Sequence, residues 1–60
     1  MRYYIVRYRI EGSFADIIRY KVCYEGLKNP HVFIKSFSSF RSARKYCEEH
    51  GFLYSYIKEI

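Results

Sequence analysis

The sequence lacks most of the features that assign a chain to a functional class. Its only cysteines, Cys23 and Cys47, lie far apart and show neither a CxxC nor a zinc-type spacing. No apolar run approaches the roughly 20 residues of a membrane span, and no continuous apolar segment follows the N-terminal charges as in a signal peptide. We therefore expect a cytoplasmic protein without membrane, metal or cofactor, whose cysteines are reduced and pack as small hydrophobic side chains.

Acidic residues are scarce: six face eleven lysines and arginines, and the net charge is +5. This excess favours a polyanion or an acidic partner, although it could equally keep an aromatic-rich chain soluble. Sixty residues without a repeat, linker or low-complexity tract predict one compact domain over 1–60. A chain of this size that begins at Met1 is typical of small accessory regulators such as those of phages and plasmids.

Catalytic patterns are also missing. His31 and His50 are the only histidines, and His50 follows Cys47 by three residues on an expected helix. That pair lacks an orienting carboxylate and an evident oxyanion site. We expect no enzyme activity, and we expect His50 to interact favourably with the end of the helix dipole.

Aromatic residues, by contrast, are abundant: eight tyrosines and five phenylalanines make up 22% of the chain. Over residues 2–10 they alternate with arginine at strand spacing, so that successive side chains point to opposite faces. One set can enter a core and the other combines rings with cations. The first set is Tyr4, Val6, Tyr8 and Ile10; the second is Tyr3, Ile5, Arg7 and Arg9.

The remaining periodicities predict further strands over 17–24, 31–37 and 52–60 and a helix over about 39–50. Ser38 or Ser39 can cap the start of the helix, and Gly51 can adopt the left-handed conformation that ends it. Loops are expected at 11–16 and 25–30, where glycine, asparagine and proline gather.

The order β-β-β-α-β predicts an α+β mini-domain with one helix packed on one face of a four-stranded, mainly antiparallel sheet. Because unpaired cations resist burial, we expect the helix to cover the less charged set, namely Tyr4, Val6, Tyr8, Ile18, Tyr20 and Val22, through Phe40, Ala43 and Cys47. The uncovered face would then be basic and aromatic. This face would also contain Ile5. Its expected binding residues are Tyr3, Arg7, Arg9, Arg19, Lys21, Phe33, Lys35, Tyr54, Tyr56 and Lys58.

Such a face predicts binding of nucleic acid, because rings stack on unpaired bases and cations neutralise phosphates. A different class of function fits the same surface: a protein partner, or a second copy in a homodimer. The rings could also serve the core alone, since a small domain needs bulky residues, and long cationic stems could cover those on the surface.

The helix carries a second basic group formed by Arg41, Arg44 and Lys45, which share a face at helical spacing. This group could grip a phosphate backbone. It could equally form a solvated face paired with Glu48 and Glu49.

The segment Phe33–Tyr46 resembles the strand-to-helix joint of the hybrid-binding domain at the N-terminus of ribonucleases H. A basic aromatic strand ends there in a Ser-Phe pair and leads into a helix whose alanine faces the sheet. The resemblance covers about a quarter of the chain and implies binding to RNA–DNA hybrids. The chain departs from that family by having a loop where the family has a helix between its second and third strands, and by a strand after the last helix. No binding residue is carried over from it.

Overall fold

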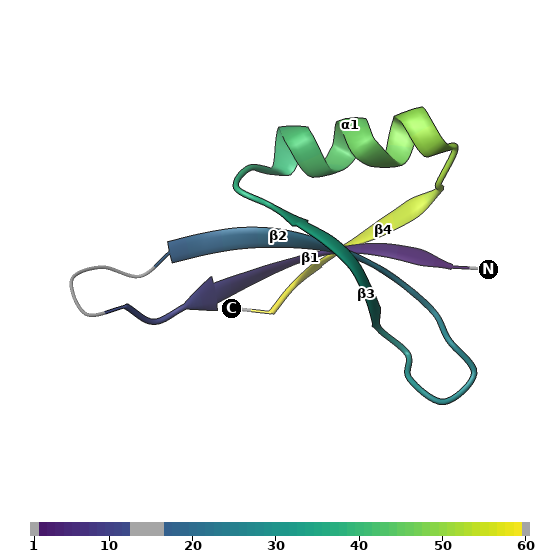
Figure 1. Ribbon diagram of the computed structural model, residues 1–60, viewed down its shortest axis with the longest axis horizontal. Coiled ribbons are helices and arrows are strands. Elements are labelled where there is room, and N and C mark those ends of the chain that lie inside the picture. Colours follow the sequence, from purple (N-terminus) through teal and green to yellow (C-terminus); the bar gives the residue numbers. More distant parts are fainter. Residues whose placement is uncertain (1, 13–16, 60) are drawn as a thin grey trace.

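The computed structural model describes residues 2–12 and 17–59, and it confirms the predicted β-β-β-α-β order. The elements are β1 (Tyr3–Ile10), β2 (Ile17–Tyr24), β3 (Val32–Phe37), α1 (Phe40–His50) and β4 (Tyr54–Lys58). The sheet has the order β3-β2-β1-β4, with antiparallel pairing throughout except for the parallel pair β1–β4. The helix lies on one face of this sheet (Figure 1). The part of the expected loop that falls on residues 13–16 lies outside the described residues.

Both ends of α1 form as the sequence predicts. The Ser39 hydroxyl accepts a hydrogen bond from the backbone N–H of Ser42 at 3.2 Å, which satisfies a first-turn amide. Gly51 ends the helix at φ 70°. The His50 ring donates from Nδ1 to the Tyr46 carbonyl oxygen at 2.9 Å, because that oxygen can only accept.

The core lies between α1 and the sheet. Its fully buried members are Ile5, Val22, Ala43 and Cys47, with a rim of half-buried rings that includes Tyr20 and Phe40. Ile5 and Val22 are partners across β1 and β2, and directly paired residues place their side chains on the same face. The helix therefore packs on the odd-numbered residues of β1 and the even-numbered residues of β2.

This register corrects the expected faces for β1 and β4. Tyr3, Ile5, Arg7 and Arg9 lie on the helix side, and Tyr4, Val6 and Tyr8 lie on the open face. Parallel pairing with β1 brings Tyr54, Tyr56 and Lys58 to the helix side as well. The assignment of β2 is confirmed: Ile18, Tyr20 and Val22 face the helix, while Arg19 and Lys21 face away.

The two arginines avoid burial because the helix is shorter than the strand beneath it. Eleven helical residues span about 16 Å, whereas the eight residues of β1 span about 26 Å. The first helical residue, Phe40, contacts the Tyr20 ring, which lies in the row of Arg7. Strands β1 and β2 run on past this end of α1, as Figure 1 shows. Arg9, which pairs with Ile18, lies beyond the row of Arg7 and Tyr20 on the same face.

A bulge in β3 corrects the third strand. Phe33 pairs with Cys23 and Lys35 pairs with Val22, so that Ile34 is the extra residue. Phe33 keeps its expected place on the open face. Lys35 turns to the helix side, where its ammonium nitrogen lies 5.9 Å from the centre of the Tyr46 ring.

Candidate functional site

Cations from two neighbouring strands gather on the helix side of the sheet, next to the first turn of α1. Arg7 and Lys58 are direct neighbours across β1 and β4, and Arg9 follows on the same face of β1. Tyr56 precedes Lys58 on that face and is 48% exposed. We call Arg7, Arg9, Tyr56 and Lys58 the β1–β4 patch.

Aromatic rings pack against one another beside the patch. The Phe40 ring meets the Tyr56 ring edge to face, with centroids 5.2 Å apart, and meets Tyr54 in the same manner at 6.2 Å. Such geometry favours ring pairs through their quadrupoles. Phe40 thus packs against Tyr56 while nearly half of the surface of that residue remains accessible.

The patch carries three cationic side chains, those of Arg7, Arg9 and Lys58. Among the described residues, the Glu11 carboxylate lies 3.6 Å from the Arg9 guanidinium. The first turn of α1 contains no acidic residue, so the positive end of the helix dipole is not neutralised locally. Arg41, in that turn, is exposed.

The open face is different in character. It contains the following side chains: Tyr4, Val6, Tyr8, Ile10, Ile17, Arg19, Lys21, Cys23, Phe33, Ser55, Ile57 and Glu59. Its two cations are tied to neighbours. The Arg19 guanidinium donates to the Ser36 hydroxyl at 3.1 Å, and the Lys21 ammonium lies 3.9 Å from the Glu59 carboxylate and 5.1 Å from the centre of the Tyr8 ring.

Side chains of the open face also bury one another. Val6 and Cys23 are each only 1% exposed, although no helix covers this side. Val6 lies between Lys21 and Ile57 in register, and the Lys21 stem reaches over Tyr8. This face therefore forms a second, thin apolar layer with a nearly balanced charge.

The ten predicted binding residues are thus divided between two surfaces. Arg19, Lys21 and Phe33 are together on the open face, whereas Tyr3, Arg7, Arg9, Lys35, Tyr54, Tyr56 and Lys58 lie on the helix side. Within the second set, Tyr3 stacks on Phe52, and Lys35 lies over the Phe37 ring of β3 and the Tyr46 ring of α1, so neither joins the β1–β4 patch.

The predicted basic group on α1 is also divided. Arg44 pairs with Glu48 at 3.3 Å, one turn along the helix, as expected of a solvated face. Arg41 and Lys45 are exposed. The pairing of Arg44 favours the solvated-face alternative for that residue.

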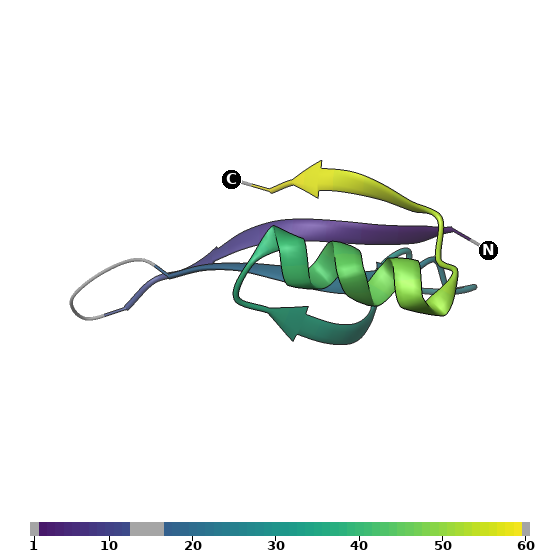
Figure 2. The ribbon, with the colours of Figure 1, turned by 90° about the horizontal axis from the view of Figure 1, so that it is seen from above.

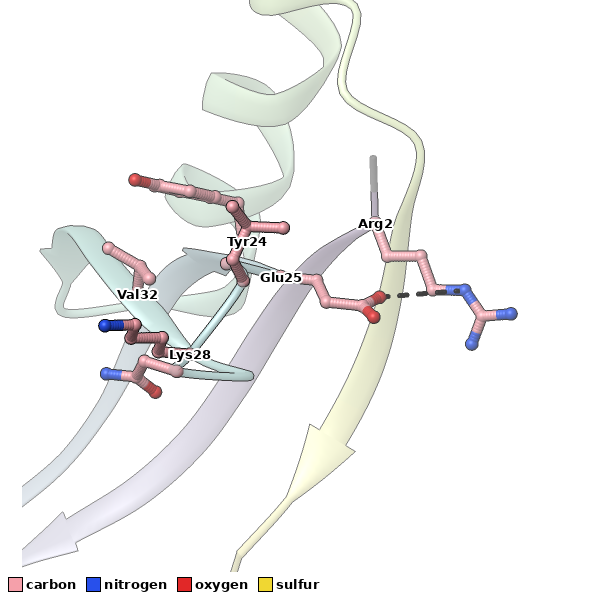
Figure 3. Close-up of a pocket in the computed structure, with 8 residues that line it drawn as sticks. Arg2, Tyr24, Glu25, Lys28 and Val32 are labelled. Atoms are coloured by element: carbon pink, nitrogen blue, oxygen red, sulfur yellow. Dashed lines mark ion pairs between the residues drawn. The ribbon is translucent and has the colours of Figure 1, made fainter.

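A shallow hollow of about 830 Å³ lies at the opposite end of the sheet, around the β2–β3 loop (Figure 3). It is lined by residues that include Arg2, Tyr24 and Lys28. An ion pair between Arg2 and Glu25, with a 3.9 Å separation, lies at its edge. The hollow is widely open and brings no set of reactive side chains together.

Both cysteines are free and buried, as predicted. Burial raises the pKa of the Cys47 thiol, and it raises the pKa of the Cys23 thiol against the opposing effect of Lys21. A raised pKa keeps a thiol protonated and poorly nucleophilic.

Within residues 2–12 and 17–59, no three histidine, cysteine or acidic side chains are grouped so that they could hold a metal ion. The one helix of the described chain is too short and too polar to cross a membrane. Comparisons with protein-family models, with curated proteins and with solved structures find no match for the chain.

The sequence interpretation missed the apolar character of the open face, although a signal for it was present. The expected strands 2–10 and 17–24 imply that Ile10 and Ile17 form the closing pair of the hairpin. This pairing joins odd residues of the first strand to even residues of the second, and so puts Arg7 beside Tyr20. We assigned the two faces from charge alone and did not use this pairing of odd with even residues.

Proposed function

We propose that this protein binds nucleic acid, with single-stranded segments as the preferred ligand, through the β1–β4 patch. One observation carries the proposal: Arg7 and Lys58 are adjacent across two strands, Arg9 extends the row, and the half-exposed Tyr56 ring lies beside them. Cations adjacent to an accessible ring are the combination that single strands require, since the cations meet phosphates and the ring stacks on a base.

The chemistry of the patch favours single strands over duplexes. The rise of one residue along a strand is about 3.3 Å, so Arg7 and Arg9 lie about 7 Å apart on one face. This surface is flat and short, and no helix projects from it into a groove. A ring such as Tyr56 reaches only bases that are not already stacked within a duplex.

The test is a fluorescence anisotropy titration with single-stranded and duplex oligonucleotides at two salt concentrations. The main variant is Arg7→Gln with Arg9→Gln. Its matched control is Arg2→Gln with Lys28→Gln, which removes the same charge at the other end of the sheet. We expect the main variant to lower the slope of log affinity against log salt by about 1.4, or about 0.7 per lost phosphate contact. The control should bind almost as the parent does.

Variants of Tyr56 distinguish the contribution of ring stacking to binding from the contribution of charge. Tyr56→Ala should weaken single-strand binding by about 1–3 kcal/mol, whereas Tyr56→Phe, which keeps the ring, should bind like the parent. Circular dichroism of each variant checks that the sheet is intact. Absence of binding at low salt, or equal losses in the main variant and its control, would contradict the proposal.

A second candidate function is supported by exposed apolar side chains on the open face. Phe33 is 59% exposed and Ile17 is 53% exposed, and Ile17 pairs directly with Ile10 on the same face. Aromatic and aliphatic side chains on a nearly neutral surface are typical of a protein interface. A photo-crosslinking amino acid at position 33 should then capture one discrete protein in cells, and the same group at position 28 should not. Identical patterns from both positions would contradict this candidate.

A further inference from the structure

Strand β4 forms an outer edge of the sheet, and its outward side is regular. The backbone N–H of Glu59 donates to the carbonyl oxygen of Arg7 at 3.0 Å, and Arg7 is in register with Lys58. In a parallel ladder with this register, the residues of β4 that bond β1 are the odd-numbered ones. The backbone groups of Tyr54, Tyr56 and Lys58 therefore point away from β1.

The helix does not cover this edge. Figure 2 shows α1 above the part of the sheet formed by β1, β2 and β3, with β4 to one side. The described contacts of α1 with β4 are those of the Phe40 ring with Tyr54 and Tyr56, on the helix side of the strand. The edge strand thus presents exposed backbone groups and, on its helix side, the rings of Tyr54 and Tyr56. Such an edge is a template for pairing with another strand.

The other edge of the sheet is protected in a way that β4 is not. Strand β3 carries the bulge at Ile34, with Lys35 directly after it. A bulge hinders strand addition at an edge. No register irregularity occurs between β4 and β1 over Tyr54–Lys58. Pairing with a further strand is therefore directed to β4.

We propose that β4 pairs in antiparallel fashion with β4 of a second copy of this chain, about a two-fold axis at Tyr56. This register overlaps all five residues of both strands. Tyr56 meets Tyr56 of the second copy, and Tyr54 meets Lys58 of the second copy. All of these residues turn their backbone groups outward, so each pair exchanges N–H···O bonds.

The side-chain chemistry favours this register. Lys58 lies opposite a tyrosine ring, an arrangement that gains from cation–π attraction. The same chain already places Lys21 over the Tyr8 ring at 5.1 Å and Lys35 over the Phe37 ring at 5.5 Å. The two Lys58 residues stay four residues apart, or about 13 Å, whereas a two-fold axis at Lys58 would set like charges opposite each other.

Pairing in this register is isologous, as a closed dimer requires. The result is a continuous eight-stranded sheet with both helices on one side, since the two-fold axis runs perpendicular to the sheet. The β1–β4 patches of the two copies then lie on that same side. Self-association through β4 does not depend on nucleic acid binding, and neither Arg7 nor Arg9 contributes backbone groups to this edge.

The first test is sedimentation of the full chain over a concentration series. We expect the 7.4 kDa monomer mass to double as concentration rises. Tyr56→Pro removes an outward N–H without touching the ladder to β1, and should abolish the doubling. Tyr56→Val is its matched control, because it loses the ring but keeps the N–H, and should still dimerise. Circular dichroism confirms that both variants are folded.

Disulfide crosslinking tests the proposed register independently, even if the Tyr56→Pro variant unfolds. Opposed residues of a hydrogen-bonded antiparallel pair have Cα atoms about 5.5 Å apart, within disulfide range. Tyr56→Cys should thus form a covalent dimer under mild oxidation, and Ser55→Cys, whose two copies are not opposed, should not. A monomer at every concentration overturns the proposal. A dimer that persists in folded Tyr56→Pro, or crosslinks equally at position 55, also overturns it.

Discussion

The ring of Phe52 stacks on the ring of Tyr3 with centroids 4.0 Å apart and an interplanar angle of 7°. Phe52 is the second residue after α1, and its backbone N–H donates to the Cys47 carbonyl oxygen at 2.8 Å. Gly51 donates to the Glu48 carbonyl oxygen in the same turn, which completes a Schellman motif. Gly51 and Phe52 thus end the helix together, and the Phe52 ring attaches that end to β1.

Replacement of Phe52 should therefore weaken the whole domain. We expect Phe52→Ala to lower the free energy of unfolding by about 2–3 kcal/mol, somewhat less than the roughly 3–5 kcal/mol for a fully buried phenylalanine. Phe52→Leu should cost less, because it retains apolar contact with Tyr3 but loses the stack. Urea unfolding measures both variants. Equal stability of Phe52→Ala and the parent would show that the stack contributes nothing.

Substitution of Gly51 tests the backbone conformation of the same turn without changing side-chain packing. Its φ is 70°, and a Cβ placed on it would meet no atom within 4 Å. The expected loss for Gly51→Ala, about 1–2 kcal/mol, is therefore conformational. Gly51→Asn is the matched control, since asparagine tolerates the left-handed region, and should lose clearly less. Thermal unfolding would contradict this account if asparagine and alanine were equally destabilising.

Gly26 is constrained by space instead. A Cβ there would lie 2.8 Å from Val32 Cγ2 and 3.0 Å from the backbone oxygen of Asn29, and that same oxygen accepts the Gly26 N–H at 2.9 Å. We expect Gly26→Ala to cost about 1–3 kcal/mol through overpacking. Part of the loss should be recovered when Val32→Ala is added, which a double-mutant cycle measures. If the losses of stability from the two substitutions simply add, the strain does not arise from contact with Val32.

The buried thiols predict a loss of stability in alkaline solution. Burial raises the pKa of Cys47, so the folded state holds the proton more tightly than the unfolded state does. This contribution is fully present below the ordinary thiol pKa of about 8.5 and is lost as the pH rises through the folded pKa. Urea unfolding at pH 7.5 and 9.5 should show a smaller decline for Cys47→Ala than for the parent. The same decline in both would refute the assignment.

The helix and its ends were predictable because their signals are local. Ser39 needs only the amide of Ser42 to act as a cap, and Gly51 needs only its own backbone freedom. The first three strands were predictable to within one residue for a similar reason, because alternation is a property of neighbouring residues. The last strand was predicted over 52–60, but β4 runs only over Tyr54–Lys58. The three-strand meander followed from short connections.

The composition of the faces was harder to predict because it depends on register. Arg7 shares a face with Ile5 whatever happens elsewhere, yet only the pairing with Tyr20 decides which face that is. We expected every residue on the helix side of the sheet to be buried. However, α1 begins with Phe40 at the row of Arg7, because the helix is shorter than β1, and it leaves the end of the strand uncovered.

The sequence by itself determined the elements, their order and the α+β class, since each depends on periodicity and capping within a few residues. Only the tertiary structure decided where β4 pairs, that a bulge turns Lys35 to the helix side, and that Arg7, Arg9, Tyr56 and Lys58 gather on one surface. The physical reason is that a one-residue change in register exchanges the two faces of a strand. Register is set by packing between segments far apart in the chain, here Ile5 and Val22 against Ala43 and Cys47.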